Sequence, residues 1–246
     1  MFDYDLFTKT VIKANKELYW YINTNMSSLD LEESKTIGYG GDKTLNIDII
    51  AEKIFIKYLS GFGDIFSEEI GLVSSKSNIK IIIDPLDGSH NFLSQLPYYG
   101  TSIALQIDGI TKAAYVTNLS NATMIYKLNK EKKNISLLDE KEINICEVVN
   151  PQIAIFERAY AYPKICEELN KKRIKFRSPG AVALSLAYAN NVNFVLFAGK
   201  IREFDIAASL YINNKLFIHQ DDEFLIVTKN DAFLDLIKDI IKNNKI

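Results

Sequence analysis

A run of four isoleucines within six residues, IKIIID at 79–84, constrains the fold more than any other feature of the sequence. A continuous apolar run of this length, rich in β-branched side chains, is typical of a strand that is buried on both faces. The run ends abruptly in Asp84 and Pro85. The chain is therefore expected to contain a sheet whose buried strand ends in an acidic loop.

Helical and strand patterns surround this run. Apolar residues three or four apart predict a long helix over 3–25 and a second helix over 47–59, with Asn46 as its cap. The glycines between 38 and 41 suit a turn or hairpin. DIFSEE, at 64–69, is interpreted as a strand that ends in acids. Several short strands from about 99 to 145 predict an antiparallel meander.

After Asn150-Pro151 the predicted elements change to alternating strands and helices, which places a domain boundary near residue 150. We expect an N-terminal α+β lobe over 1–150 and a C-terminal α/β lobe over 151–246. The predicted C-terminal elements are strands at 153–156, 173–177 and 193–197, helices at 163–171, 179–191, 203–212 and 231–242, and a strand pair near 215–227. The charged stretch KLNKEKKN, at 127–134, is interpreted as a solvated hairpin tip.

The charge and hydropathy of the chain exclude several classes of function. The 246 residues carry 29 Lys and Arg against 31 Asp and Glu, so no basic excess points to nucleic acid. No apolar run of 18 or more residues predicts a membrane span. Asp3 and Asp5 lie where a signal peptide would carry positive charge, which favours a cytoplasmic protein. Cys146 and Cys166 form neither a disulfide framework nor a metal-site spacing.

The segment DPLDGSHNF, from Asp84 to Phe92, concentrates groups that suit metal and phosphate chemistry. Two carboxylates three residues apart, Asp84 and Asp87, can point at one spot after a buried strand. The helix expected to begin after Gly88 offers free backbone N–H groups, which attract phosphate oxygens. Carboxylates, together with the carbonyl of Leu86, are the oxygen ligands that Mg²⁺ accepts. Taken alone, however, Asp-Pro and Asp-Gly are common turn pairs.

Other segments of the chain supply acidic residues that could lie near this one. Glu68 and Glu69 end the preceding strand and could lie beside Asp84 in a neighbouring strand of the same sheet. GGDKTLNID supplies Asp42, Thr44 and Asp48 upstream, and REFDIAASL supplies Asp205 downstream. Asp48 and Asp205 each stand near a helix start, where complementarity to the helix dipole is the simplest reading for a single acid.

Together these segments resemble the lithium-sensitive, metal-dependent phosphatases, which include inositol monophosphatase and the archaeal-type fructose-1,6-bisphosphatases. The resemblance covers residues from about 40 to 210 and rests on four motifs in the family's order: GGDKTLNID, SEE, DPLDGSHNF and FDIAA. It implies a layered α/β/α/β/α sandwich, with the site between the two lobes. It also makes a homodimer plausible.

The resemblance also implies roles for individual residues. Two or three Mg²⁺ ions would be held by these metal ligands: Glu68, Asp84, Asp87, Asp205 and the carbonyl of Leu86. Asp48 and Ser89 would help to activate the nucleophilic water. The amides of Gly88 and Ser89 would hold the phosphate. Gly180 and Ala181 match a segment that lines the substrate pocket, and Lys200 and Arg202 match positions that contact substrate.

Departures from the family pattern bear on substrate. The family commonly continues its Asp-x-Ala-Ala helix with Glu-Ala-Gly-Gly, whereas this chain has LYINNKLFIHQDD, which leaves the local backbone there open. Phe204 replaces the usual Trp. Lys200, Arg202 and Arg177 could equally be solvated charges. His90 occupies a variable position of the signature, so neither it nor His219 is expected to be catalytic.

The sequence thus predicts a Mg²⁺-dependent phosphatase that hydrolyses a small phosphate monoester, most readily inositol monophosphate or a related sugar phosphate. Two metal ions can align the attacking water and the leaving oxygen, so no His, Cys or Ser nucleophile is needed. Fructose-1,6-bisphosphatase and histidinol-phosphatase activities stay open as alternatives. A catalytically inactive sensor that binds metal and phosphate is the alternative from another class; the presence of Asp48 and Ser89 argues against it.

Overall fold

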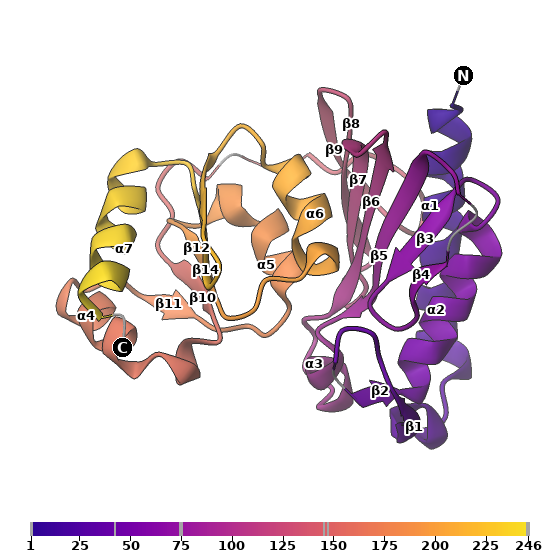
Figure 1. Cartoon of the computed structure of the whole chain (residues 1–246), viewed down its shortest axis with the longest axis horizontal. Helices are drawn as coiled ribbons and strands as arrows, with labels where there is room; N and C mark the ends of the chain where they lie inside the picture. Colours follow the sequence, from indigo (N-terminus) through magenta and orange to yellow (C-terminus); the bar gives the residue numbers. More distant parts are fainter. Residues whose placement is uncertain (1, 42, 74–75, 145, 147, 245–246) are drawn as a thin grey trace.

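The computed structural model describes residues 2–41, 43–73, 76–144, 146 and 148–244. Two sheets and three layers of helices stack across the long axis of the molecule (Figure 1). From the N-terminal side the order is helices, seven-stranded sheet, helices, five-stranded sheet, helices. The α/β/α/β/α sandwich predicted from the resemblance is therefore confirmed.

The first sheet has the strand order β4-β3-β5-β6-β7-β8-β9. Its strands are β3 (Asp64–Ser67), β4 (Gly71–Val73), β5 (Ile79–Asp87), β6 (Gly100–Ile107), β7 (Ile110–Asn118), β8 (Thr123–Leu128) and β9 (Glu131–Ser136). β3 and β5 run parallel, and the other neighbours are antiparallel. The isoleucine-rich strand β5 lies inside the sheet, as its composition predicts.

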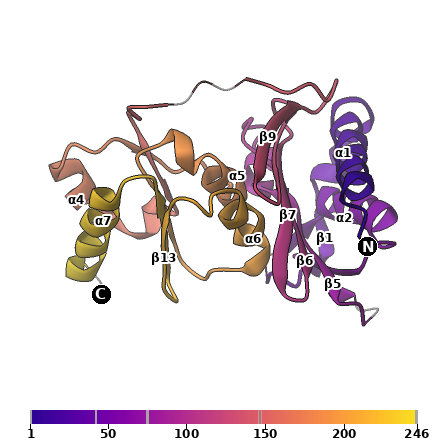
Figure 2. The ribbon, with the colours of Figure 1, turned by 90° about the horizontal axis from the view of Figure 1, so that it is seen from above.

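Both faces of this sheet are covered because successive side chains of a strand point to opposite faces. Ile81 and Ile83 pack in the core beneath α1 (Tyr4–Trp20) and α2 (Asn46–Leu59). Ile82 points the other way, into the core shared with α5 (Val182–Ala187) and α6 (Glu203–Ile212). Figure 2 shows α5 and α6 between the two sheets and α1 and α2 on the far side.

The second sheet has the order β11-β10-β12-β14-β13. Its strands are β10 (Ala154–Glu157), β11 (Phe176–Arg177), β12 (Val195–Ala198), β13 (Phe217–Gln220) and β14 (Phe224–Thr228). Ile155 packs toward the middle helices, whereas Ala154 and Phe156 pack toward α4 (Pro163–Lys171) and α7 (Asp231–Asn244). The middle helices thus share an apolar core with each sheet.

Several expected elements differ in detail. Asn46 does not cap α2, because its side chain donates to the carbonyl of Leu29 and Leu45 is the cap residue. β5 continues to Asp87 through an irregularity after Asp84. The helix predicted over 179–191 is shortened to α5, and the strand predicted over 173–177 to β11.

Two further expectations concern surface features. The glycine-rich segment after 37 does connect a hairpin, β1 (Glu33–Ile37) with β2 (Lys43–Leu45). KLNKEKKN forms the β8–β9 hairpin, yet Lys127 is only 3% exposed, so the interpretation as a solvated tip is wrong for this residue. No helix in the described part of the chain combines the length and apolar character needed to cross a membrane. The domain boundary near residue 150 stays a prediction.

Candidate active site

The carboxyl ends of β3 and β5 bring the first two acids together. β3 and β5 are parallel, and Ser67 lies opposite Ile83. The next residue along each chain segment, Glu68 in one and Asp84 in the other, therefore lies close to its counterpart. The backbone N–H of Glu68 donates to the carbonyl of Ile83 over 3.2 Å. Glu68 therefore lies beside Asp84, as the sequence predicts.

Asp205 joins this pair from the middle layer. It lies in the first turn of α6, which packs against the first sheet. The hydroxyl of Ser102 in β6 donates to the carbonyl of Phe204 over 3.3 Å, which fixes the start of the helix on the sheet. Asp205 is 2% exposed, so its carboxylate lies between the layers.

One carboxylate oxygen from each of Glu68, Asp84 and Asp205 lies within 4.8 Å of the others. Opposite ligands of a Mg²⁺ ion lie about 4.2 Å apart, because each is about 2.1 Å from the ion. The three acids therefore need only a small inward movement to share one hard divalent cation. Acidic oxygens are also the donors that such a cation prefers.

Burial makes this cluster electrostatically costly without a cation. Desolvation raises the pKa of Glu68 to about 8, with further upward contributions from Asp205 and Glu69. The pKa of Asp84 is raised well above its usual range, first by burial and then by Glu68 and Asp87. Nearby positive charge favours the ionised form of such groups. A divalent cation at this position would therefore relieve the crowding of negative charge.

Arg202 supplies part of that positive charge. Its Nη1 lies 2.7 Å from Oε1 of Glu68, and its Nε lies 2.8 Å from Oδ2 of Asp205. A second nitrogen, Nη2, donates to Oδ1 of Asp205 over 3.2 Å. The sequence analysis assigned Arg202 to substrate contact, whereas in this structure its guanidinium group binds two of the acids.

Asp87 lines the same cavity and ties it to α5. Its Oδ2 accepts the backbone N–H of Leu184 over 2.8 Å. Burial raises the pKa of Asp87 to about 7, although the backbone hydrogen bond from Leu184 opposes that rise. Leu86 also lines the cavity, and its backbone N–H donates to Oδ1 of Asp84 over 3.0 Å.

Asp48 reaches the cavity from the start of α2. Its Oδ2 accepts the backbone N–H of Leu45 over 2.8 Å, and its Oδ1 is buried without a hydrogen-bond partner among the described residues. Burial raises the pKa of Asp48 to about 7. An unpaired buried oxygen is costly, so this atom fits a position that faces a cation or a water. Asp42, which the sequence analysis placed nearby, lies outside the described residues.

Gly88 allows the chain to turn between β5 and the helix that follows it. Its φ of 87° is left-handed, and a Cβ here would lie 2.9 Å from Cβ of Ala181 and 3.0 Å from the carbonyl of Tyr98. Only glycine fits without strain. The next residue, Ser89, begins the helix α3 (Ser89–Leu93), whose first backbone N–H groups have no partner within the helix.

The loop that contains Gly180 lies against α3. The side-chain nitrogen of Asn91 donates to the carbonyls of Tyr98 and Pro179 over 2.8 and 2.7 Å. Gly180 lines the same cavity as Ser89, and Ala181 is buried against the first sheet. The loop after β5 and the loop before α5 therefore line the same cavity.

Two adjoining cavities share His90, Gly180, Val182, Arg202 and Asp205. The smaller, about 140 Å³, contains the acidic cluster with Asp48, Asp87 and Ser89. The larger, about 620 Å³, is lined on its far side by Arg158, Tyr160 and Lys200. The site therefore combines a small acidic chamber with a wider, more basic one.

Sequence reasoning missed Glu157 and Arg158, at the end of β10. Glu157 is 1% exposed and accepts the backbone N–H of Gly180 over 2.9 Å and the hydroxyl of Ser185 over 2.5 Å. Through these contacts it positions the loop beside the cavity. An acid that directly follows the apolar run IAIF is the signal that could have found it, because site residues gather at strand ends.

We expect Glu157→Ala to lower the free energy of unfolding by about 3 kcal/mol, because the N–H of Gly180 and the hydroxyl of Ser185 lose a charged acceptor. Glu157→Gln keeps the shape and can bond both groups, so less than half of that loss is expected. Urea unfolding of the two variants measures the difference. An alanine variant within about 0.5 kcal/mol of the parent chain would contradict the positioning role.

A sequence model of the inositol monophosphatase family matches residues 3–214. The chain belongs to the inositol monophosphatase family. The match begins earlier than the four motifs and includes the first helix. It extends through α6, so it takes in the first sheet, the middle helices and strands β10 to β12 of the second sheet.

Individual relatives differ in name and in coverage. Nus factor SuhB of Xylella fastidiosa is 30% identical over 221 residues, covering 85% of this chain and 77% of the relative. A fructose-1,6-bisphosphatase/inositol-1-monophosphatase of Thermococcus kodakarensis is 29% identical, covering 74% and 69%. The fructose-1,6-bisphosphatase of Pyrococcus furiosus is 28% identical over 62% of this chain, and the match spans only 58% of that relative.

Solved structures share the fold across the whole chain. An inositol monophosphatase–fructose-1,6-bisphosphatase superposes with a TM-score of 0.79 at 22% identity, covering 97% of this chain and 100% of that one. An inositol monophosphatase of Thermotoga maritima gives a TM-score of 0.74 at 21% identity, covering 96% and 98%. At these identities the likeness concerns the fold alone.

Proposed function

We propose that this chain is a Mg²⁺-dependent phosphatase that hydrolyses a small phosphate monoester of a sugar or polyol. The convergence of Glu68, Asp84 and Asp205, from three distant segments, carries the proposal. Bound divalent ions would supply Lewis-acid stabilisation of phosphate charge and would make water a better nucleophile. Two or three ions follow from the family resemblance.

The residues of the chain would divide the remaining work. Oδ1 of Asp48, buried and unpaired among the described residues, is suited to accept a proton from water, and the hydroxyl of Ser89 would orient that water. The N–H groups of Gly88 and Ser89 would hold phosphate oxygens. Asp87 and the carbonyl of Leu86 would be further metal ligands, as the family resemblance implies, and Asp87 would also hold α5 in place through the N–H of Leu184.

The larger cavity suggests the substrate class. Its 620 Å³ would accommodate a six-carbon sugar or cyclitol next to the acidic chamber. Lys200 and Arg158 would meet hydroxyl groups or a second phosphate. Inositol monophosphate or a related sugar phosphate is the leading substrate, and fructose 1,6-bisphosphate follows from the two basic residues and from the names of several relatives. Histidinol phosphate stays a third option.

A phosphate-release screen over sugar, inositol, nucleotide and amino-alcohol phosphates tests the proposal. We expect release that requires Mg²⁺, is abolished by EDTA and is strongest with one sugar or polyol phosphate. The same screen with Asp84→Asn gives the background. Release that is equal in both chains, or none with any ester, would overturn the proposed activity.

A role without turnover is the second candidate, because the relatives named Nus factor SuhB cover more of this chain than the fructose-1,6-bisphosphatase of Pyrococcus furiosus does. Such a protein would bind Mg²⁺ and a phosphate ester without hydrolysis. Isothermal titration with Mg²⁺, run beside the release assay, separates the two: binding without release favours this candidate.

The family resemblance also motivates a homodimer, and Asp3 and Asp5 motivate a cytoplasmic location; both stay proposals. Light scattering on the purified chain tests the first, and cell fractionation tests the second. The division into lobes over 1–150 and 151–246 is tested by limited proteolysis, with cleavage expected first near residue 150.

A further inference from the structure

We propose that a groove between the β8–β9 hairpin and the end of α6 is a second binding site, for a small phosphate-bearing anion. The groove is separate from the acidic chamber and from the larger cavity beside it. It lies on the hairpin that the sequence analysis interpreted as merely solvated.

Four lysines line one part of this groove, a cavity of about 210 Å³. They are Lys127, Lys130, Lys132 and Lys215, which line it together with Asn190, Ile212, Asn213 and Leu216. The first three come from the hairpin of the first sheet and the last follows α6. The positive charges therefore converge from two lobes, although the whole chain has a formal net charge of −2.

Part of this arrangement is structural. Nζ of Lys127 donates to the carbonyl of Ile212 over 3.5 Å and to Oδ1 of Asn214 over 2.5 Å. A cation at the C-terminus of a helix is favourable, so the end of α6 accounts for one buried lysine. Nζ of Lys132 donates to Oδ1 of Asn213 over 3.4 Å. Lys130 and Lys215, which are exposed and line the same cavity, have no such contact among the residues that the structure describes.

The positive charge exceeds what its surroundings neutralise. Among the described residues, none of the four lysines forms an ion pair with a carboxylate. The pKa of Lys127 is lowered by burial and by the charge of Lys215, and the pKa of Lys132 by burial and by the charge of Lys127. A bound anion would relieve this repulsion, because opposite charge favours the ionised form.

The groove continues into a second cavity of about 330 Å³ that shares Lys132 and Asn190. Asn134 and Asn191 line it, with Ile125 and Ala187 beneath. Amide groups offer donors to phosphate oxygens without adding charge. Lysine ammonium groups bind phosphate as point charges, so the two parts together suit one or two phosphate groups on a small molecule.

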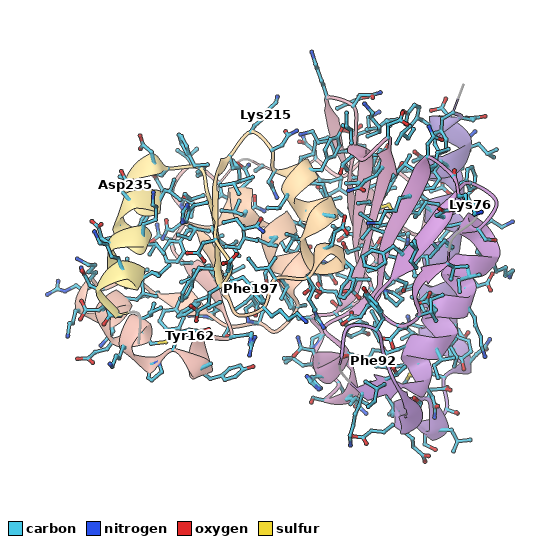
Figure 3. All side chains as sticks on the ribbon, viewed as in Figure 1. Lys76, Phe92, Tyr162, Phe197, Lys215 and Asp235 are labelled. Carbon is cyan, nitrogen blue, oxygen red and sulfur yellow. The ribbon has the colours of Figure 1, made fainter. Side chains whose placement is uncertain are left out.

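This groove lies at the opposite edge of the molecule from α3. Figure 3 labels Lys215 at the upper edge between the sheets and Phe92, in α3, near the lower edge. Neither lysine cavity shares a residue with the two cavities of the candidate active site. An anion bound here would bridge the two lobes without entering the catalytic chamber.

Titration calorimetry with inorganic pyrophosphate, in EDTA so that no divalent ion recruits it to the acidic chamber, tests the site. We expect saturable binding that weakens as NaCl rises. Lys132→Gln combined with Lys215→Gln should raise the Kd at least about tenfold, which is about 1.4 kcal/mol. Lys132 and Lys215 are chosen over Lys127, which is only 3% exposed and whose loss would disturb folding.

Two controls make the outcome decisive. Lys9→Gln combined with Lys172→Gln removes the same charge from exposed positions elsewhere and should leave the Kd within about twofold. Lys200→Gln, in the larger cavity, should also leave it unchanged. Loss of binding in Lys200→Gln, equal loss in both double variants, or no binding by the parent chain would overturn the proposal. A parallel titration with glycerol 2-phosphate shows whether the site takes esters or only inorganic anions.

Discussion

Asp84→Asn is expected to lower kcat on the preferred phosphate ester by at least about 10²-fold, the scale of losing one key electrostatic stabiliser. Asp84 belongs to the acidic cluster, in which one oxygen from each of Glu68, Asp84 and Asp205 lies within 4.8 Å of the others. Asparagine keeps the shape and can still accept the N–H of Leu86, so the loss reports on charge. Steady-state kinetics with saturating Mg²⁺ measures it.

Asp30→Asn is the matched control, because it neutralises another buried carboxylate, one that accepts hydrogen bonds from Tyr21 and Ser27 and lines neither cavity of the candidate site. It should keep kcat within a factor of about two. The folded state of Asp84→Asn should be at least as stable as the parent chain in EDTA, since burial disfavours the charge that it removes. A variant with near-normal kcat would show that Asp84 does not hold the catalytic metal.

Addition of Mg²⁺ to the metal-free protein should stabilise it by about 2.7 kcal/mol when Mg²⁺ reaches 100 times its Kd. For a chain of this size, the melting temperature should rise by about 5 to 10 °C. The physical reason is the crowding of buried acids: Glu68, Asp84 and Asp205 repel one another, and Arg202 neutralises them only in part.

Thermal melts in EDTA and in rising Mg²⁺ measure this effect without any substrate. Asp84→Asn should abolish most of the Mg²⁺-dependent shift, whereas Asp30→Asn should retain it. If the parent chain melts at the same temperature with and without Mg²⁺, the acids do not form a cation site. Because the readout is stability, it distinguishes failure of the metal site from the choice of a wrong substrate in the release screen.

Arg202 contacts the same acids that the kinetic and thermal measurements probe. Its guanidinium group forms ion pairs with Glu68 and Asp205, and it also lines the larger cavity. The same side chain therefore stabilises the acidic cluster and lies at the boundary between the two cavities. The contact between Arg202 and substrate stays a prediction.

Much of the architecture follows from local sequence. The apolar run at 79–83 could only be a buried strand, and the periodicity of apolar residues placed α1, α4, α6 and α7 within a few residues of their ends. The four motifs led to the family, and the family to the layered fold. Such features are local, because periodicity and turn chemistry act over a few residues.

Local sequence patterns do not predict contacts between segments that are distant along the chain. Asn46 was expected to cap α2, but Leu29, brought near by the fold, takes its side chain. Lys127 looked solvated in a charged hairpin, yet the end of α6 packs against it. Glu157 belongs to no recognised motif. Its hydrogen bond to the backbone N–H of Gly180 forms only because the fold brings the end of β10 next to that loop.

The sequence by itself determined which acids this protein has for metal chemistry and which strand ends present them. Only the tertiary structure decided that Glu68, Asp84 and Asp205 meet, that Arg202 neutralises them, and that four lysines gather at the opposite edge. The reason is physical: the position of a charge along the chain follows from the sequence, but its energy depends on burial and on neighbours that packing of the two lobes brings together.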